Sequence, residues 1–146
     1  MYFINPTREQ FKRLHALLPD QPACMLNLLR FRETVEGQQG VRGFEAYERY
    51  SREAREALAS VGGKVIWIGQ PMQTFIGPQD EAWDLAFVAV YPTPAAFIGL
   101  VKSDAYQAAA RHRTSALADS RLIVCAPLEP GESFAPRAYL HAPPAR

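Results

Sequence analysis

Two short segments of this sequence are apolar on both faces of an extended chain, and they constrain the fold more than any other feature. In residues 83–91 the alternating positions are apolar on both sides, with Leu85 and Phe87 on one face and Val88 on the other. Residues 23–31 form an apolar run that is too short for anything but a buried strand. Both strands are therefore predicted to be central in a sheet, and both faces of that sheet need cover.

Helical spacing and capping signals predict helices between these strands. Thr7 stands three residues before Gln10, which is the spacing of a capping box. Thr93 followed by proline is a typical helix start, and Gly62 with Gly63 is a typical helix stop. The predicted helices are residues 7–18, 44–61, 95–101 and 104–117, and the predicted strands are residues 23–31, 64–76, 83–91 and 121–126.

This order is a helix, then β-α-β-β-α-β, then a tail, and it predicts an α+β ferredoxin-like sandwich. We expect one domain over residues 1–146, with a core at 23–126, an extra N-terminal helix at 7–18 and a proline-rich C-terminal tail at 127–146. In a sheet of order 4-1-3-2, the first and last strands are antiparallel neighbours. Cys24 and Cys125 are therefore expected at the same end of adjacent strands.

Composition narrows the classes of function. Sixteen basic and fifteen acidic side chains leave a formal charge of +1, which gives no electrostatic footprint for nucleic acid or an anionic membrane. No apolar run is long enough to span a bilayer, and the first residues lack the basic and apolar regions of a signal peptide. We expect a cytoplasmic protein with reduced cysteines, no nucleic-acid partner and no membrane association.

Several segments in a fixed order carry a resemblance to a known family. They are Met25 to Phe31, the helix with Tyr47 and Tyr50 that ends in Gly62-Gly63, Trp83-Asp84 before Tyr91-Pro92, Phe97 with Ser103 to Tyr106, and Arg111-His112-Arg113. Over residues 23 to 126 the chain resembles the family called domain of unknown function 1330. The resemblance implies a dimeric α/β barrel, in which two ferredoxin-like sheets pack face to face, and hence a homodimer.

That superfamily also includes small monooxygenases that use no cofactor, ring isomerases, dehydratases and haem enzymes, and fold does not choose among them. The family brings no agreed activity, so the resemblance assigns no catalytic residue. It also leaves the N-terminal helix and the tail unexplained.

Asn27 is the most informative single residue, because an amide within an apolar strand must find hydrogen-bond partners. It either faces a ligand or binds a nearby loop or helix end. Arg30 is expected on the opposite face of the same strand. There it either binds an anion or forms an ion pair at the end of the strand.

His112 and Arg113 are adjacent on a predicted helix. Histidine can transfer a proton near neutral pH, and arginine can bind a carboxylate or enolate, so the pair suits an acidic or phenolic substrate. The alternatives are a solvated basic face, which we favour for Arg111, and a packed histidine.

Aromatic residues supply the remaining candidates for ligand binding. We expect Trp67 and Trp83 on neighbouring strands, with aromatic helix residues above them that either line an apolar pocket or fill the core. Those helix residues are Tyr47, Tyr50, Phe97 and Tyr106. Asp84 is a candidate base only if it is buried.

The sequence lacks a glycine-rich phosphate loop, a G-x-S-x-G motif and an H-E-x-x-H motif, and His15 and His141 fall outside the predicted core. We therefore expect no metal and no cofactor, although His112 as a haem ligand stays open. Our hypothesis is a dimeric α/β-barrel protein that binds a small molecule. It would act as a cofactor-free enzyme, similar to a monooxygenase or an isomerase, on an aromatic or carbonyl compound. Asn27, His112 and Arg113 would supply the polar contacts. The alternative is a non-catalytic dimer whose core is filled by side chains.

Overall fold

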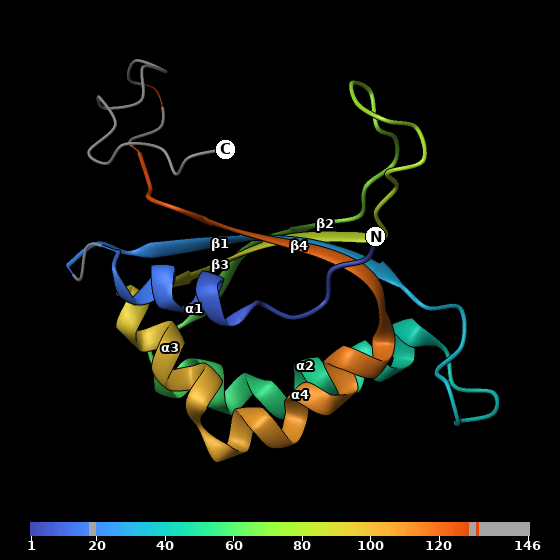
Figure 1. Cartoon of the computed structure of the whole chain (residues 1–146), viewed down its shortest axis with the longest axis horizontal. Helices are drawn as coiled ribbons and strands as arrows, with labels where there is room; N and C mark the ends of the chain where they lie inside the picture. The colour runs from blue at the N-terminus through green and yellow to red at the C-terminus, as the bar shows by residue number, and fades with distance from the viewer. Residues whose placement is uncertain (18–19, 129–130, 132–146) are drawn as a thin grey trace.

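The computed structural model describes residues 1–17, 20–128 and 131 (Figure 1). Its elements follow the predicted order of a helix and then β-α-β-β-α-β, with the second helical region divided in two. The helices are α1 (Arg8–His15), α2 (Gly43–Ser60), α3 (Pro94–Lys102) and α4 (Asp104–Ala116), and the strands are β1 (Ala23–Phe31), β2 (Lys64–Gly69), β3 (Leu85–Tyr91) and β4 (Leu117–Cys125). Within the described ranges no helix is long and apolar enough to cross a membrane.

The four strands form one antiparallel sheet of order β2-β3-β1-β4, which confirms the ferredoxin-like topology. Asn27, near the middle of β1, has Phe87 of β3 and Leu122 of β4 as its register partners. Cys24 and Cys125 face each other across β1 and β4 as predicted, and both are free thiols. The two strands that are apolar on both faces therefore hold the centre of the sheet.

The helices cover one face of this sheet and leave the other open, as the edge-on view of Figure 1 shows. On the helix side of β1, Met25, Asn27 and Leu29 are buried. On the opposite side, which we call the outer face, Leu26 and Leu28 are only half-buried. In the described part of the chain, no helix or strand packs on the outer face.

Three predicted strand boundaries differ from the structure by two residues or more. The second strand was expected to run over residues 64–76 but ends at Gly69, because Pro71 has no backbone N–H for the ladder. The third begins at Leu85 and not at residue 83. The last strand begins at Leu117 and not at residue 121, because Leu117 has extended backbone and pairs with Phe31.

Residues 70–84 form an arm that projects from the sheet on the side away from the helices (Figure 1). The predicted N-terminal helix over residues 7–18 ends at His15, earlier than expected. Most of the tail at 127–146, with its edge segment at 137–141, lies outside the described residues.

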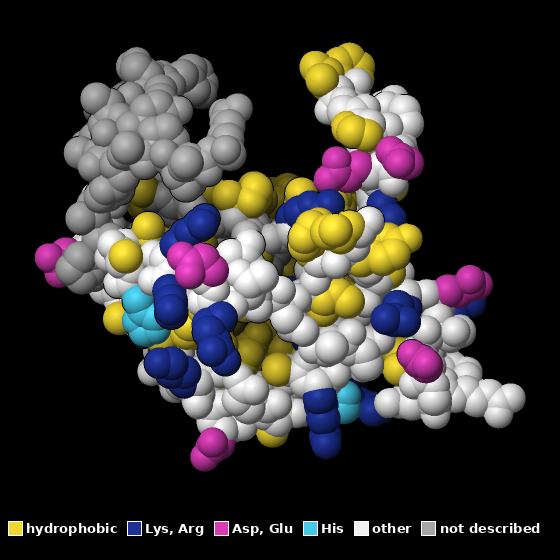
Figure 2. All heavy atoms as spheres, in the orientation of Figure 1, with side chains coloured by type: hydrophobic (Ala, Val, Ile, Leu, Met, Phe, Trp, Pro, Cys, Tyr) yellow, Lys and Arg dark blue, Asp and Glu magenta, His cyan; other side chains and the backbone are white. Residues whose placement is uncertain are grey.

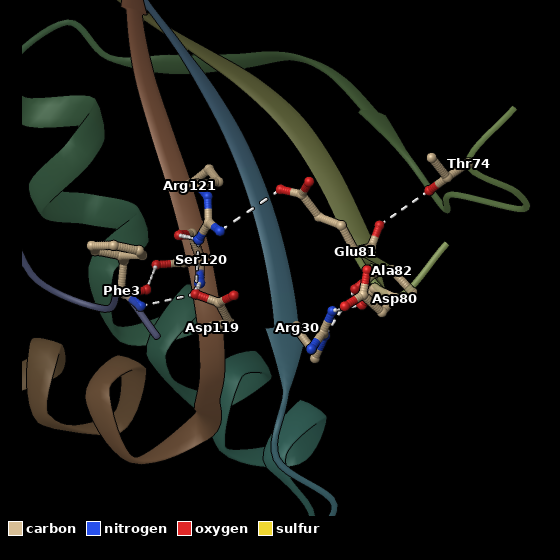
Figure 3. A network of polar contacts seen from close by, with 9 residues as sticks. All are labelled: Phe3, Arg30, Thr74, Asp80, Glu81, Ala82, Asp119, Ser120 and Arg121. Carbon is tan, nitrogen blue, oxygen red and sulfur yellow. Dashed lines mark hydrogen bonds and ion pairs between the residues drawn. The ribbon is translucent and has the colours of Figure 1, made fainter. Parts of the chain in front are cut away.

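The N-terminal segment is fixed to the edge of the sheet by β4 (Figure 3). The Phe3 amide donates to Asp119 Oδ1 at 2.8 Å, and Ser120 Oγ donates to the Phe3 carbonyl at 2.6 Å. Arg121 Nη1 lies 2.8 Å from the same Asp119 oxygen. Burial by itself raises the pKa of Asp119, but the Phe3 amide, Arg121 and the Ser120 amide together outweigh it and hold the pKa below its ordinary value.

We predict that Asp119→Asn lowers the free energy of unfolding at pH 7 by about 1–3 kcal/mol, because it removes the charge that these donors bind. A carboxyl group whose pKa is lower in the folded state stabilises the fold at pH values above its unfolded pKa of about 3.9. This stabilisation is lost as pH falls through the folded pKa. The gap between wild type and variant in urea denaturation should therefore be full at pH 7 and close below about pH 4. The exposed Asp20→Asn is the control, and a gap that does not change with pH would contradict the account.

Candidate functional site

A cavity of about 1720 Å³ lies between the helix-facing side of the sheet and helices α2 and α4. Ligand pockets of proteins are usually about 300–1,000 Å³, so the space is ample for a small molecule. Figure 2 shows hydrophobic side chains at the bottom of a hollow between the sheet and the helices. The buried core forms two clusters, one around Leu29 and Tyr47 and the other around Met25 and Tyr91, and the cavity lining includes residues of both.

Asn27 lies on β1 between these two clusters and lines the cavity. Its side chain is buried, with 6% of the residue exposed, and Nδ2 donates to the Met25 carbonyl at 3.0 Å. Among the described residues, no donor reaches its Oδ1, and that oxygen is not sealed from solvent. The amide oxygen is therefore an unused acceptor on the floor of an apolar cavity, as the ligand-facing hypothesis for Asn27 requires.

Three tyrosines form the wall opposite Asn27. Tyr50 Oη donates to Tyr106 Oη at 3.2 Å, and the rings of Tyr47 and Tyr50 have centroids 5.1 Å apart. Burial is the main cause that raises the pKa of Tyr47 and of Tyr50 well above the ordinary value. These phenols stay protonated near neutral pH, so they act as hydrogen-bond donors and not as bases.

Arg113 lines the cavity from the last turn of α4. Its Nη1 donates to the Ile4 carbonyl at 2.6 Å and so holds the N-terminal segment at the cavity edge. Its charge also lowers the pKa of Tyr47, although burial of that phenol outweighs the effect. Asn27, Tyr47, Tyr106 and Arg113 therefore line one cavity.

His112 is not part of this set. Its Nε2 lies 3.4 Å from Glu53 on α2, its side chain is only 14% exposed, and it is absent from the cavity lining. Neighbouring residues on a helix point about 100° apart, so the turn that directs Arg113 into the cavity directs His112 toward α2. The structure thus separates His112 from Asn27, and within the described ranges no group of three His, Cys, Asp or Glu side chains is placed to hold a metal ion.

Arg30, Trp67 and Trp83 also lie away from the cavity. Arg30 Nε donates to Ala82 and Nη2 to Asp80, both backbone carbonyls at 2.9 Å (Figure 3). Its guanidinium lies over the Trp83 ring, 5.7 Å from the centroid. Trp67 pairs with the outer-face residue Val88, and 54% of it is exposed.

Asp84 has a structural contact of its own. Its Oδ2 accepts the Phe31 amide at 2.8 Å, and the residue is exposed, so it does not meet the condition that made it a candidate base.

The sequence reasoning missed two groups of residues. Ile4 and Phe11 of the N-terminal segment line the cavity, and the amphipathic pattern of residues 7–18 was the signal that this segment covers something apolar. The arm presents Met72, Phe75 and Ile76, which are 97%, 85% and 89% exposed. Hydrophobic side chains at the arm tip are visible in Figure 2. From the sequence, these apolar residues were expected to continue the strand over residues 64–76.

Comparison with known proteins bears on the fold more than on the site. Residues 37–126 match the family described as domain of unknown function (DUF1330). A protein of unknown function from Rhodopseudomonas palustris is 42% identical with a TM-score of 0.85, and the match covers 89% of this chain and 100% of that chain. A dimeric protein of unknown function with a ferredoxin-like fold from Bacteroides fragilis has 9% identity and a TM-score of 0.50, covering 75% of this chain and 99% of that chain. No curated protein matches.

We predict that Asn27→Leu leaves the free energy of unfolding unchanged or raises it, because a leucine removes the cost of burying an amide at an apolar floor. An asparagine that holds the fold together would instead lose about 1–3 kcal/mol on this substitution. Ser120→Ala is the matched control, since its hydroxyl does bind the Phe3 carbonyl, and it should be destabilising by about 1 kcal/mol. Urea denaturation of the three proteins decides between the two roles of Asn27.

Proposed function

The chain belongs to the family of domain of unknown function DUF1330, and we propose that it binds a small aromatic or carbonyl compound in the cavity between its helices and its sheet. The observation that carries the proposal is the open space next to Asn27, whose Oδ1 has no donor among the described residues. That oxygen is open to the cavity, so a ligand that enters can donate a hydrogen bond to it. The same cavity argues against the alternative of a filled, purely structural core.

The chemistry of the lining supports an aromatic or carbonyl ligand. The walls include the rings of Phe31, Phe87, Phe97 and several tyrosines, and aromatic rings pack well against a flat ligand. Phenol hydroxyls and a guanidinium are donors that suit ligand oxygens. These donors would also stabilise negative charge on a ligand oxygen, as the cofactor-free chemistry expected from the sequence requires.

We further propose that the protein acts as a homodimer through the outer face of the sheet. That face carries Leu26, Leu28 and Val88, all half-buried, and Ile123, which is 50% exposed. An open apolar face of this kind is unusual for a monomer. The Bacteroides fragilis relative is described as dimeric, and the apolar tip of the arm projects on the same side as the outer face.

Binding of N-phenyl-1-naphthylamine, a neutral aromatic fluorophore, tests the cavity. We expect saturable binding with a blue shift to wild type, and at least about tenfold weaker binding to Ala110→Phe, which places a ring in the cavity from α4. Ala108→Phe, at an exposed position of the same helix, should bind like wild type. Equal binding to all three proteins, or none to wild type, would contradict the proposed function.

Light scattering at micromolar concentration tests the dimer. Wild type should have twice the mass of one chain, and Leu26→Lys should be monomeric, because it places a charge in the centre of the outer face. Leu17→Lys, which adds the same charge outside this face, should stay dimeric. Far-UV circular dichroism checks that both variants fold, and a monomeric wild type would refute the proposal.

A further inference from the structure

The charged side chains around the cavity are unevenly distributed. Its lining includes the five cationic residues Arg55, Lys64, Arg111, Arg113 and Arg121, and one carboxylate, Glu48. Arg121 is ion-paired with Asp119 and Glu81. Glu48, Arg55, Lys64 and Arg111 are exposed, whereas Arg113 is half-buried and lines the cavity from α4. Apolar walls strengthen the field of a half-buried charge, so Arg113 favours an anion in the cavity. The near-zero net charge of the whole chain conceals this local excess.

Arg113 is the cation best placed to bind a ligand. Of the acidic side chains that the structure describes, none forms an ion pair with it. A guanidinium has five N–H donors, and the one hydrogen bond of Arg113, to the Ile4 carbonyl, leaves most of them free. The fork of donors matches the two oxygens of a carboxylate.

Tyr106 supplies a second donor on the same face of α4. Its Oη accepts a hydrogen bond from Tyr50 Oη, so its own O–H is free to donate, and no described residue accepts it. Arg113 is seven positions after Tyr106, which corresponds to about two helical turns, or about 10 Å of rise along the helix axis. The small side chains of Ala109 and Ala110 stand between them, and Ala110 lines the cavity. The inner face of α4 is therefore a shallow apolar channel with a hydrogen-bond donor at each end.

We propose that the ligand is a carboxylate, bound by Arg113 at one end of this channel, with its apolar body over Ala110 and a second oxygen atom at Tyr106. This inference rests on the proposed ligand-binding function and adds the class of ligand to it. An aromatic acid with a carbonyl or hydroxyl group at its far end fits both donors. Asn27 Oδ1 lies across the cavity on β1 and is an acceptor. It can therefore bind a donor group of the ligand, but not the ionised carboxylate, which has no proton to donate.

The experiment uses two ligands of the same shape. The compounds 2-naphthoate and 2-naphthamide share a ring system and differ in charge, and each is titrated against protein loaded with N-phenyl-1-naphthylamine. Wild type should bind the naphthoate at least about tenfold more tightly than the naphthamide, which is the discrimination expected of a charge-assisted hydrogen-bonded pair. The preference should fall as salt is raised, because charges near a wide opening are screened.

Variants assign this preference to Arg113. Arg113→Gln should lose it by weakening the naphthoate alone, while Arg113→Lys should keep part of it. Arg49→Gln, an exposed position of α2 outside the cavity lining, removes the same charge and should bind like wild type. Unchanged affinity of Arg113→Gln for the naphthamide shows that its cavity is intact.

The outcomes separate this inference from the function it extends. If wild type binds the neutral fluorophore but does not distinguish the two naphthyl compounds, the carboxylate assignment is wrong and the binding function stands. If Arg113→Gln weakens both compounds equally, Arg113 has a structural role and the assignment is again wrong. If the neutral fluorophore itself does not bind to wild type, the proposed function fails with it.

Discussion

The structure depends on how the helices are held away from the sheet. Helices α2 and α4 pack against each other far more closely than either packs against a strand. Aromatic side chains fill the space between the layers at both ends, where Phe31 meets Tyr47 with centroids 5.4 Å apart and Tyr91 meets Phe97 at 5.1 Å. Large side chains at the ends and small ones on the middle of α4 leave the centre open. The cavity is thus a consequence of where the bulky residues are placed.

The N-terminal segment completes one side of that space. It is bound to β4 through Asp119 and Ser120 and to α4 through Arg113, so it connects the two layers at the cavity edge. Arg113 consequently has two contacts of different kinds, one to the backbone of this segment and one proposed to a ligand. Binding of an acid at Arg113 would then influence how firmly the segment closes the cavity.

A second network of polar contacts holds the base of the arm. Arg30 binds two of its backbone carbonyls, and Arg121 lies 3.7 Å from Glu81 (Figure 3). Among the described residues Arg30 forms no ion pair at the strand end, and its donors bind backbone carbonyls instead. Its place on the face opposite Asn27 followed from strand alternation alone and is confirmed.

Residues on strands with unbroken alternation were predictable from the sequence, and residues whose direction depends on a local irregularity were not. The pairing of Cys24 with Cys125 and the position of Asn27 follow from topology and period. Trp67 does not line the cavity because a shift of register between Val65 and Trp67 reverses the alternation of β2. His112 does not face the cavity, because the rotation of α4 about its axis decides which of two adjacent residues does. The sequence pattern does not fix that rotation.

The central claim is that the space beside Asn27 exists in the folded protein and holds a ligand. A crystal structure of protein purified without added small molecules tests it most directly. The account predicts an open cavity between the sheet and α4, with electron density of a bound molecule that contacts Arg113. A core in which Phe87, Phe97 and Tyr106 close over Asn27, leaving no space, would contradict it.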